Sequence, residues 1–351
     1  MKRLARSAML LCIACAAIEA ASWKFAVSGD SRNCGGMVMP AIAAGVRSAG
    51  ADFYWHLGDF RMTYGIDEDM SPPAKLGLPA ARLSLAEYQQ GAGWADFIAR
   101  QMGPFGDLPI FLIPGNHETI LPSTRERYLI QFADWIDTPV LRAQRLQDDP
   151  RDHKLRAYYH WVTHNIDFVA LDNASEDQFD EAQLKWFHSV LDRDEASDEI
   201  RSIVVGMHAT LPGSIGSDHS MSAWSQGEKS GREVYEALWR VQARTHKRVY
   251  LLASHSHFYM EDVYRTEQWK GMVLPGWIVG TAGAVRYRLP SNTGSHRKAM
   301  TDVYGYLLAT VTEDSSISFS FQQLSLKDLR RMNQGKYPDQ LIRWCYDENR
   351  R

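Results

Sequence analysis

The sequence predicts an α/β protein built from layers of sheet and helix, and two observations indicate this fold class. Short apolar runs rich in Val, Ile, Phe and Tyr alternate with amphipathic segments of helical length, as they do in layered α/β folds. Five of these runs end in small or turn residues, as buried strands commonly do. The chain has 351 residues, 45% of them hydrophobic, which is enough to bury a large core.

In the first half of the chain, each predicted strand stops at a turn signal. The run at 23–28 ends in Ser-Gly-Asp and the run at 52–57 ends in Gly-Asp, with a helical pattern over 37–46 between them. Prolines and glycines interrupt the stretch 61–83, which is therefore predicted to be irregular. A helical pattern then returns over 85–102, and a third strand is expected just before Gly115-Asn116.

In the second half, the pattern again alternates. The charged stretch 138–156 is predicted to be a loop, and two β runs at 157–162 and 166–171 predict a hairpin. The segment 178–192 carries apolar residues along one face and predicts a helix. The polar stretch 211–230 contains three glycines and predicts a long binding loop or lid. The last strands are expected at 277–283, 303–311 and 315–322.

The two ends of the chain differ from its middle. Residues 1–20 have a basic start followed by an apolar stretch too short to span a bilayer, which is typical of a signal peptide, although an uncleaved anchor is the alternative. We therefore expect a secreted or periplasmic protein with no transmembrane span in the mature chain. Residues 21–325 are expected to form one domain, and residues 326–351 a polar C-terminal tail.

Charge and cysteine content narrow the possible partners. The net charge is -3, from 39 basic and 42 acidic residues, and no run of five like charges occurs, so nucleic acid binding is not expected. Once residues 1–20 are removed, the remaining cysteines are Cys34 and Cys345. They either form a disulfide in an oxidising compartment or stay apart as two thiols.

The most informative feature is a set of metal-ligand residues that directly follow apolar runs. Ligands of open α/β sheets bind at the carboxyl ends of strands, so residues at several such ends can build one site. The candidate ligands are Asp30, Asp59, Asn116, His208, His255 and His257. Taken singly, each has an ordinary explanation, as a turn carboxylate, an Asx-turn or a core histidine. Taken together, their mixed oxygen and nitrogen atoms suit Zn, Mn, Fe or Co.

These motifs resemble those of the calcineurin-like metallophosphoesterases, a family that includes purple acid phosphatases, nucleotidases and phosphodiesterases. The resemblance extends over about residues 25–260 and keeps the order of the family's motifs. The matching segments are Gly29-Asp30-Ser31-Arg32, Gly58-Asp59, Gly115-Asn116-His117-Glu118, Met207-His208 and Ser254-His255-Ser256-His257.

The resemblance implies a fold, a cofactor and a reaction. The fold would be a two-sheet β-sandwich flanked by helices, and the cofactor two divalent or trivalent metal ions such as Mn, Fe or Zn. The protein would hydrolyse small-molecule phosphate monoesters or diesters by attack of a metal-bound hydroxide. One ion would be held by Asp30, Asp59 and His257, and the other by Asp59, Asn116, His208 and His255. His117 would hydrogen-bond the phosphate or protonate the leaving oxygen.

Two positions depart from the family pattern. Arg32 stands where the family most often has a metal-binding histidine, and a guanidinium cannot ligate a metal. Arg32 would instead contact the substrate phosphate, or it would be a surface residue paired with a neighbouring acid. Tyr64 lies five positions after Asp59, and Met62 occupies the place of the tyrosine ligand of purple acid phosphatases. An iron–tyrosinate centre is therefore not expected.

Two other classes of protein compete with this interpretation. Gly29-Asp30-Ser31 resembles the start of GDSL esterases, but no histidine has an aspartate three positions earlier to complete their catalytic machinery. The second competitor is a catalytically inactive secreted binding protein that keeps the fold, for which Arg32 is the main support. His219 either reaches the substrate from the loop after His208 or is a solvated side chain.

Overall fold

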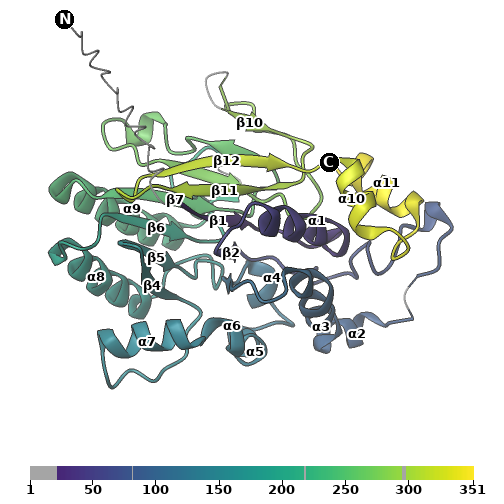
Figure 1. Cartoon of the computed structure of the whole chain (residues 1–351), viewed down its shortest axis with the longest axis horizontal. Helices are drawn as coiled ribbons and strands as arrows, with labels where there is room; N and C mark the ends of the chain where they lie inside the picture. The colour runs from purple at the N-terminus through teal and green to yellow at the C-terminus, as the bar shows by residue number, and fades with distance from the viewer. Residues whose placement is uncertain (1–21, 81, 217–218, 295–297) are drawn as a thin grey trace, which may run out of the picture.

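A computed structural model describes residues 22–80, 82–216, 219–294 and 298–351, so the expected signal peptide lies outside the described residues. Two mixed β-sheets form the centre of the molecule, with helices on their outer faces (Figure 1). The predicted α/β sandwich is therefore confirmed. In the described part of the chain, none of the helices is long and apolar enough to cross a membrane.

The first sheet contains the strands that carry the first three motifs. Its order is β12 (Ile317–Gln323), β11 (Gly305–Val311), β1 (Trp23–Ser28), β2 (Phe53–His56) and β3 (Ile110–Leu112). The strands β1, β2 and β3 are parallel, whereas β11 and β12 add to the sheet in antiparallel register. Parallel pairing brings the carboxyl ends of β1, β2 and β3 to one edge.

The second sheet contains the strands that carry the histidine motifs. Its order is β10 (Ala299–Met300), β8 (Tyr259–Glu261), β9 (Gly276–Val279), β7 (Arg248–Ala253), β6 (Ser202–Gly206), β5 (Ile166–Ala170) and β4 (Tyr159–Thr163). The strands β5, β6, β7 and β9 are parallel, and β4 and β5 form the predicted hairpin.

Aromatic side chains fill the space between the two sheets. The ring of Phe168 on β5 meets Phe25 on β1 edge-on at 5.1 Å and Phe53 on β2 at 5.3 Å between centroids. Trp161 on β4 stacks on Phe111 of β3 at 4.0 Å. Edge-to-face and offset aromatic pairs add to the free energy gained by burial, so this core fixes how one sheet lies on the other.

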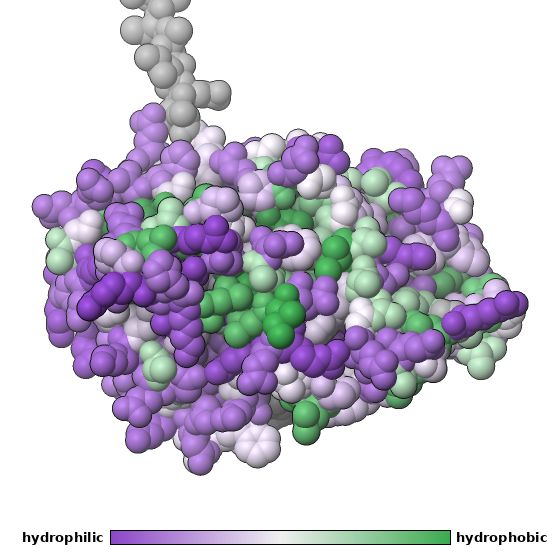
Figure 2. Space-filling view, turned by 90° about the horizontal axis from the view of Figure 1, so that it is seen from below, coloured by the Kyte–Doolittle hydropathy of each residue, from purple (hydrophilic) through white to green (hydrophobic). Residues whose placement is uncertain are grey.

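Helices cover the outer faces of both sheets (Figure 1). Beside the first sheet lie α1 (Gly35–Ser48), α10 (Leu326–Asn333) and α11 (Asp339–Asp347). Beside the second lie α8 (Glu181–Ala196) and α9 (Ser225–Thr245). The short helices α4 (Asn116–Thr119), α5 (Arg125–Gln131), α6 (Ala133–Ile136) and α7 (Pro139–Asp148) connect β3 to β4. The face of α5 to α8 is mostly hydrophilic, with a hydrophobic area near its centre (Figure 2).

The predicted helix at 85–102 forms as a series of short turns. These are α2 (Leu85–Glu87), the π-helical η2 (Tyr88–Ala92), α3 (Gly93–Asp96) and the π-helical η3 (Phe97–Met102), followed by the 3₁₀ turn η4 (Gly103–Phe105). Gly91 interrupts the helical geometry with φ of 142°, a conformation that only glycine adopts easily. The stretch 61–83 is irregular, as predicted, apart from the 3₁₀ turn η1 (Ala74–Leu76) and the undescribed residue at 81.

Two predicted loops are wrong in part. The charged stretch 138–156 contains α7, which begins after Thr138, whose side chain accepts a hydrogen bond from the Leu141 N–H at 3.4 Å. In the stretch 211–230, the loop contains the 3₁₀ turn η6 (Met221–Ala223) and ends where α9 begins at Ser225. Gly227 is buried inside α9 rather than in a loop.

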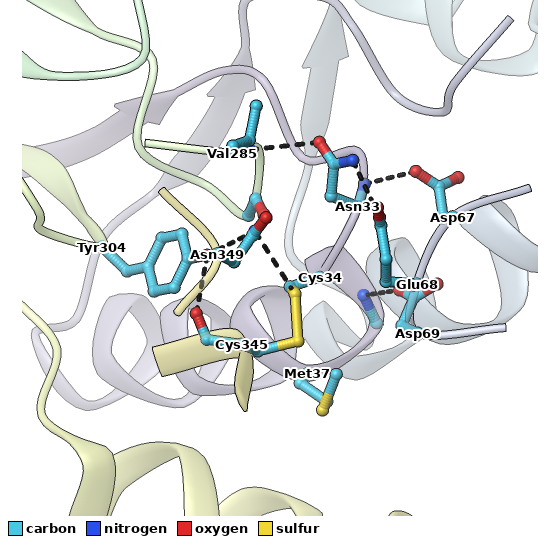
Figure 3. The surroundings of a disulfide bond; sticks show 12 residues. Asn33, Cys34, Met37, Asp67, Glu68, Asp69, Val285, Tyr304, Cys345 and Asn349 are labelled. Carbon is cyan, nitrogen blue, oxygen red and sulfur yellow. Dashed lines mark hydrogen bonds between the residues drawn. A yellow bond between two sulfur atoms is a disulfide. The ribbon is translucent and has the colours of Figure 1, made fainter. Parts of the chain in front are cut away.

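The segment 326–351, polar in sequence, consists of α10 and α11 packed beside α1. Cys345 on α11 forms a disulfide with Cys34, which precedes α1 (Figure 3). Of the two alternatives left open by the sequence, the paired cysteines are therefore the correct one. The side chain of Asn349 donates hydrogen bonds to the Gly283 carbonyl and the Tyr304 hydroxyl, so the end of the chain is fixed as well.

Candidate metal centre

The candidate ligands follow five strands of the two sheets, with Asn116 at the start of α4 and the others in loops. Backbone hydrogen bonds hold neighbouring loops together, from Asp30 N–H to the Gly58 carbonyl at 2.9 Å and from Ser254 N–H to the His208 carbonyl at 2.9 Å. Another bond crosses between the sheets, from the His208 Nδ1 to the Leu57 carbonyl at 2.8 Å. The parallel register of the strands therefore delivers side chains of both sheets to one place.

Three of the candidate ligands have a left-handed backbone. The φ angles are 61° for Asp30, 59° for Asp59 and 65° for His255. This conformation costs a residue other than glycine about 1–3 kcal/mol and persists where surrounding contacts enforce it, often at functional sites. Gly58 also has positive φ, and a Cβ there would collide with the backbone of Gly115, so the loops after β2 and β3 approach closely.

The first group of ligand atoms belongs to Asp59, Asn116, His208 and His255, and it consists of acceptors that face one another. His208 Nε2 lies 3.1 Å from Asn116 Oδ1 and 3.4 Å from Asp59 Oδ1. The other nitrogen of His208 donates its proton to the Leu57 carbonyl, so Nε2 is left with a lone pair. The imidazole of His255 lies beside that of His208, and its buried Nδ1 has no hydrogen-bond partner. Acceptors that converge without a proton between them fit a bound cation.

The second group of ligand atoms belongs to Asp30, Asp59 and His257, so it shares Asp59 with the first group. Asp30 Oδ1 lies 3.2 Å from His257 Nε2, and His257 Nδ1 donates to the Val285 carbonyl at 2.6 Å. Asp30 Oδ1 and Asp59 Oδ2 are buried without hydrogen-bond partners. Asp59 can thus offer one oxygen to each group, as a bridging carboxylate does. The donor sets of both groups fit metal ions, with Arg32 intruding on the second.

Arg32 is not the surface residue that the sequence allowed as one alternative. Its side chain is 15% exposed, and its Nε lies 3.4 Å from Asp59 Oδ2. Its Nη2 lies 3.2 Å from His257 Nε2. The acid that pairs with Arg32 is therefore the shared carboxylate of the site itself.

Burial and neighbouring charges shift the pKa values of the central groups. Burial alone would raise the pKa of Asp59, but its interactions with His117, His208 and Arg32 outweigh burial and hold the pKa below the ordinary value. Burial would also raise the pKa of Asp30, but the interaction with His257 outweighs burial and lowers it. Burial lowers the pKa of His255 to about 3. The site thus presents ionised carboxylates and a neutral imidazole, the forms that bind metal.

His117 lies next to the shared carboxylate. Its Nε2 is 3.7 Å from Asp59 Oδ2, and its backbone N–H donates to Asp59 Oδ1 at 3.1 Å. His219 is packed within the site, with its ring 5.1 Å from that of His255 and stacked on Tyr287 at 5.2 Å, so it is more than a solvated side chain. Tyr64 is 70% exposed.

Several residues that support the site were not predicted from the sequence. The buried Glu118 accepts hydrogen bonds from the backbone N–H groups of Asp59, Phe60 and Gly115 at 2.8, 3.0 and 2.8 Å. The ring of Tyr287 stacks on His257 at 4.1 Å. Glu118 belongs to a recognised motif, so its position was a usable signal, whereas no local pattern distinguishes Tyr287.

Comparison with known proteins identifies the class of this chain. Residues 37–259 match the model of the calcineurin-like phosphoesterase family, and the chain belongs to that family. No curated protein matches the sequence. The match spans all the candidate ligands from Asp59 to His257, while Asp30 precedes it.

Solved structures with the same fold have low sequence identity to this chain. A purple acid phosphatase from yellow lupin (Lupinus luteus) is 14% identical, with 92% of this chain covered and a TM-score of 0.58. This chain spans 53% of that protein, about half its length. A dimetal phosphatase from Danio rerio is 12% identical, with 86% of this chain and 96% of that chain covered and a TM-score of 0.53. The Plasmodium protein GAP50, described as an anchor in the inner membrane complex, is 12% identical, with 86% and 84% covered and a TM-score of 0.51.

Proposed function

We propose that the protein is a metal-dependent phosphoesterase that hydrolyses phosphate monoesters or diesters of small molecules. The observation that carries this proposal is the convergence of Asp59, Asn116 and His208 on one point through acceptor atoms 3.1–3.4 Å apart. Family membership supports it, because the family implies a centre of two metal ions. In the two-ion arrangement that the family implies, the ligands would be Asp30, Asp59, Asn116, His208, His255 and His257.

When bound, the metal would supply Lewis-acid charge for the phosphoryl group and lower the pKa of water to about 7. The protein's own residues orient the reaction. His117 is held beside Asp59 by its backbone hydrogen bond, so its ring is placed to donate a proton or hydrogen bond to the leaving oxygen. Arg32 is positioned to contact a phosphate oxygen that enters beside Asp59.

The proposed function is tested by hydrolysis of nitrophenyl phosphate monoester and diester substrates with Mn, Zn or Fe supplied. His208→Ala should abolish turnover and metal retention, and His117→Asn should lower kcat by about 10²–10⁴-fold with metal retained. The exposed His153, replaced by alanine, is the matched control and should leave both unchanged. Turnover that survives in His208→Ala would contradict the proposal, and the ratio of monoesterase to diesterase activity would define the substrate class.

The second candidate is a secreted binding protein with the same fold and no turnover. It is favoured by Arg32, which occupies space between Asp59 and His257. The fold of GAP50, a protein described as an anchor, is also similar, although that similarity concerns the fold alone. Wild-type protein that binds metal but hydrolyses neither ester would favour this candidate.

We also propose that the protein is exported to the periplasm or secreted. Support comes from the signal-like pattern of residues 1–20 and from the Cys34–Cys345 disulfide, a bond typical of oxidising compartments. Mass spectrometry of the protein from fractionated cells should show a chain that begins near residue 21 outside the cytoplasm. A full-length chain in the cytoplasm would contradict export.

A further inference from the structure

The guanidinium of Arg32 is built into the second ligand group. Two of its nitrogens lie 3.2 Å from His257 Nε2 and 3.4 Å from Asp59 Oδ2, and both of these atoms belong to that group. An arginine keeps its positive charge at any working pH and has no lone pair to offer a metal. It is therefore a competitor for the same ligand atoms.

The hydrogen bonds of His257 show that Arg32 already uses one of the ligand atoms. Its Nδ1 carries the proton, because it donates to the Val285 carbonyl at 2.6 Å. Its Nε2 therefore has a lone pair, and Arg32 Nη2 donates to it at 3.2 Å. Both groups place an imidazole nitrogen beside acceptors, since His208 Nε2 faces Asn116 Oδ1 and Asp59 Oδ1, and His257 Nε2 lies 3.2 Å from Asp30 Oδ1. The second group differs because the guanidinium of Arg32 lies among its ligand atoms. The second group therefore already contains one cation, the guanidinium of Arg32, which is paired with Asp59 by charge although Asp30 Oδ1 and Asp59 Oδ2 accept no hydrogen bond from the described residues.

The backbone on both sides of Arg32 is fixed. Before it, the Ser31 hydroxyl hydrogen-bonds to His56 Nε2 at 2.9 Å. After it, the Asn33 side chain accepts from Val285 N–H at 3.1 Å and donates to Glu68 at 2.8 Å (Figure 3). The disulfide of Cys34 follows directly. The backbone that carries Arg32 is consequently restrained, and the guanidinium at the end of its side chain lies beside His257 and Asp59.

We propose that Arg32 takes the place of one of the two metal ions, so that the protein holds a single resident ion, at Asp59, Asn116, His208 and His255. Arg32 then supplies the second positive charge beside Asp59, where it repels a further divalent ion and occupies the lone pair of His257. This inference deepens the proposed function, and the role of Arg32 toward a substrate phosphate rests on that function. The number of bound ions does not rest on the proposed function.

The test strips metal from the mature protein with a chelator, adds Mn²⁺ and then counts the Mn²⁺ ions that each chain binds. Titration calorimetry and elemental analysis after desalting should give one ion per chain for wild type. Arg32→His, which restores the usual family ligand, should bind two, and Arg32→Lys, which keeps the charge, should bind one. His208→Ala should lose the resident ion. Electron paramagnetic resonance should show an isolated ion in wild type and a spin-coupled pair in Arg32→His.

Each outcome decides the proposal. Two tightly bound ions in wild type would overturn it, and so would a single ion in a folded Arg32→His protein or two ions in Arg32→Lys. If Arg32→His loses its cooperative thermal transition, neutral Arg32→Gln replaces it and should bind a second ion more weakly than the first. One ion in wild type without turnover of any ester would reject the proposed enzyme while leaving the inference about Arg32 intact.

Discussion

At the scale of single residues, the position of Asp59 depends on a partner in another loop. Asp59 has a left-handed backbone, and the carboxylate of Glu118 holds its N–H and that of Phe60. Buried N–H groups that lose an acceptor cost about 1–3 kcal/mol each, so Glu118 offsets the local strain. Glu118 thereby positions the shared carboxylate through the backbone of Asp59, without itself belonging to either ligand group.

We expect Glu118→Gln to lower metal affinity by about 10–100-fold, the range seen when an outer partner of a metal site is replaced. The amide presents an NH₂ group to backbone N–H donors that the carboxylate accepts, so Asp59 would shift. Titration calorimetry with Mn²⁺ measures the effect. Glu87→Gln is the matched control, because Glu87 caps an exposed helix through similar bonds to Ser84. Equal affinities in the two variants would show that Glu118 has no positioning role.

A second buried network, away from the metal ligands, makes the stability of the protein depend on pH. His160 lies between two carboxylates, with Nδ1 2.8 Å from Asp167 and Nε2 2.5 Å from Asp148. Burial alone would lower the pKa of His160, but Asp167 and Asp148 outweigh it and raise the pKa to about 10. Burial and Asp167 also raise the pKa of Asp194 to about 9.

These shifts predict that the protein loses stability in alkaline solution. The contribution of His160 is complete below the pKa of about 6.5 in the unfolded chain and is lost as the pH rises through about 10. The raised pKa of Asp194 acts in the same direction. The free energy of unfolding in urea should fall by about 3–5 kcal/mol between pH 6 and 10. His160→Gln should be less stable at pH 6 and should show a shallower slope; an unchanged slope would contradict the assignment.

The candidate ligands were predictable because each one directly follows a strand signal in the sequence. Asp59 and His208 are examples: the apolar run, the turn and the ligand are contiguous. Tyr287 was not predictable, because its contact with His257 joins segments that only the folded sheets bring together. The burial of Arg32 also depends on distant partners, so the sequence left its role open between two alternatives.

At the scale of secondary structure, α9 shows why the loop prediction for 211–230 failed. Glycine normally indicates a loop, but Gly227 lies in the first turns of α9, where the helix approaches other backbone. A Cβ at this position would lie 2.5 Å from the carbonyl oxygen of Asp177 and 2.7 Å from that of Met221. The glycine permits close packing, and a tertiary contact of this kind leaves no periodic signal.

Gly227→Ala should therefore destabilise the protein, although alanine favours an isolated helix by about 1 kcal/mol. The added methyl group meets backbone atoms that cannot rotate away, and overpacking of this kind costs about 1–3 kcal/mol. Urea unfolding followed by circular dichroism measures the change. Lys229→Ala, at an exposed position of α9, should stay within about 0.5 kcal/mol of wild type. A stabilised Gly227→Ala protein would show that the helix can move aside.

The long strands of the two sheets were predictable from the sequence, whereas the short strands at the sheet edge were not. Strands such as β1 and β7 are six residues long and mostly apolar, and their signals are strong. The strands β8 and β10 have three and two residues and form at the sheet edge through pairing with neighbours, so the sequence gives no separable signal for them. Helix α7 was missed because its charged composition outweighed the Thr138 capping signal.

At the scale of the whole molecule, the disulfide connects the end of the chain to the start of the metal-centre loops. Cys34 immediately follows Asn33, whose side chain is bonded to Val285 and Glu68. Cys345 lies on α11, so the bond joins α11 to the first sheet's α1 across 311 residues (Figure 3). Closing so long a loop restricts the unfolded chain far more than the native one.

Replacing both cysteines with serine should lower the free energy of unfolding by about 2–5 kcal/mol, because the unfolded chain regains the lost freedom. Hydrogen exchange should increase mainly in α10 and α11, which then remain tied to the rest by buried contacts such as Leu329 and Leu341 and by hydrogen bonds such as the one from Asn333 to the Met37 carbonyl. The strands β1 and β2 should keep their protection. Wild type treated with a reductant is the matched control and should behave in the same way. Exchange that increases evenly over both sheets would instead show that the C-terminal helices and the sandwich unfold as one unit.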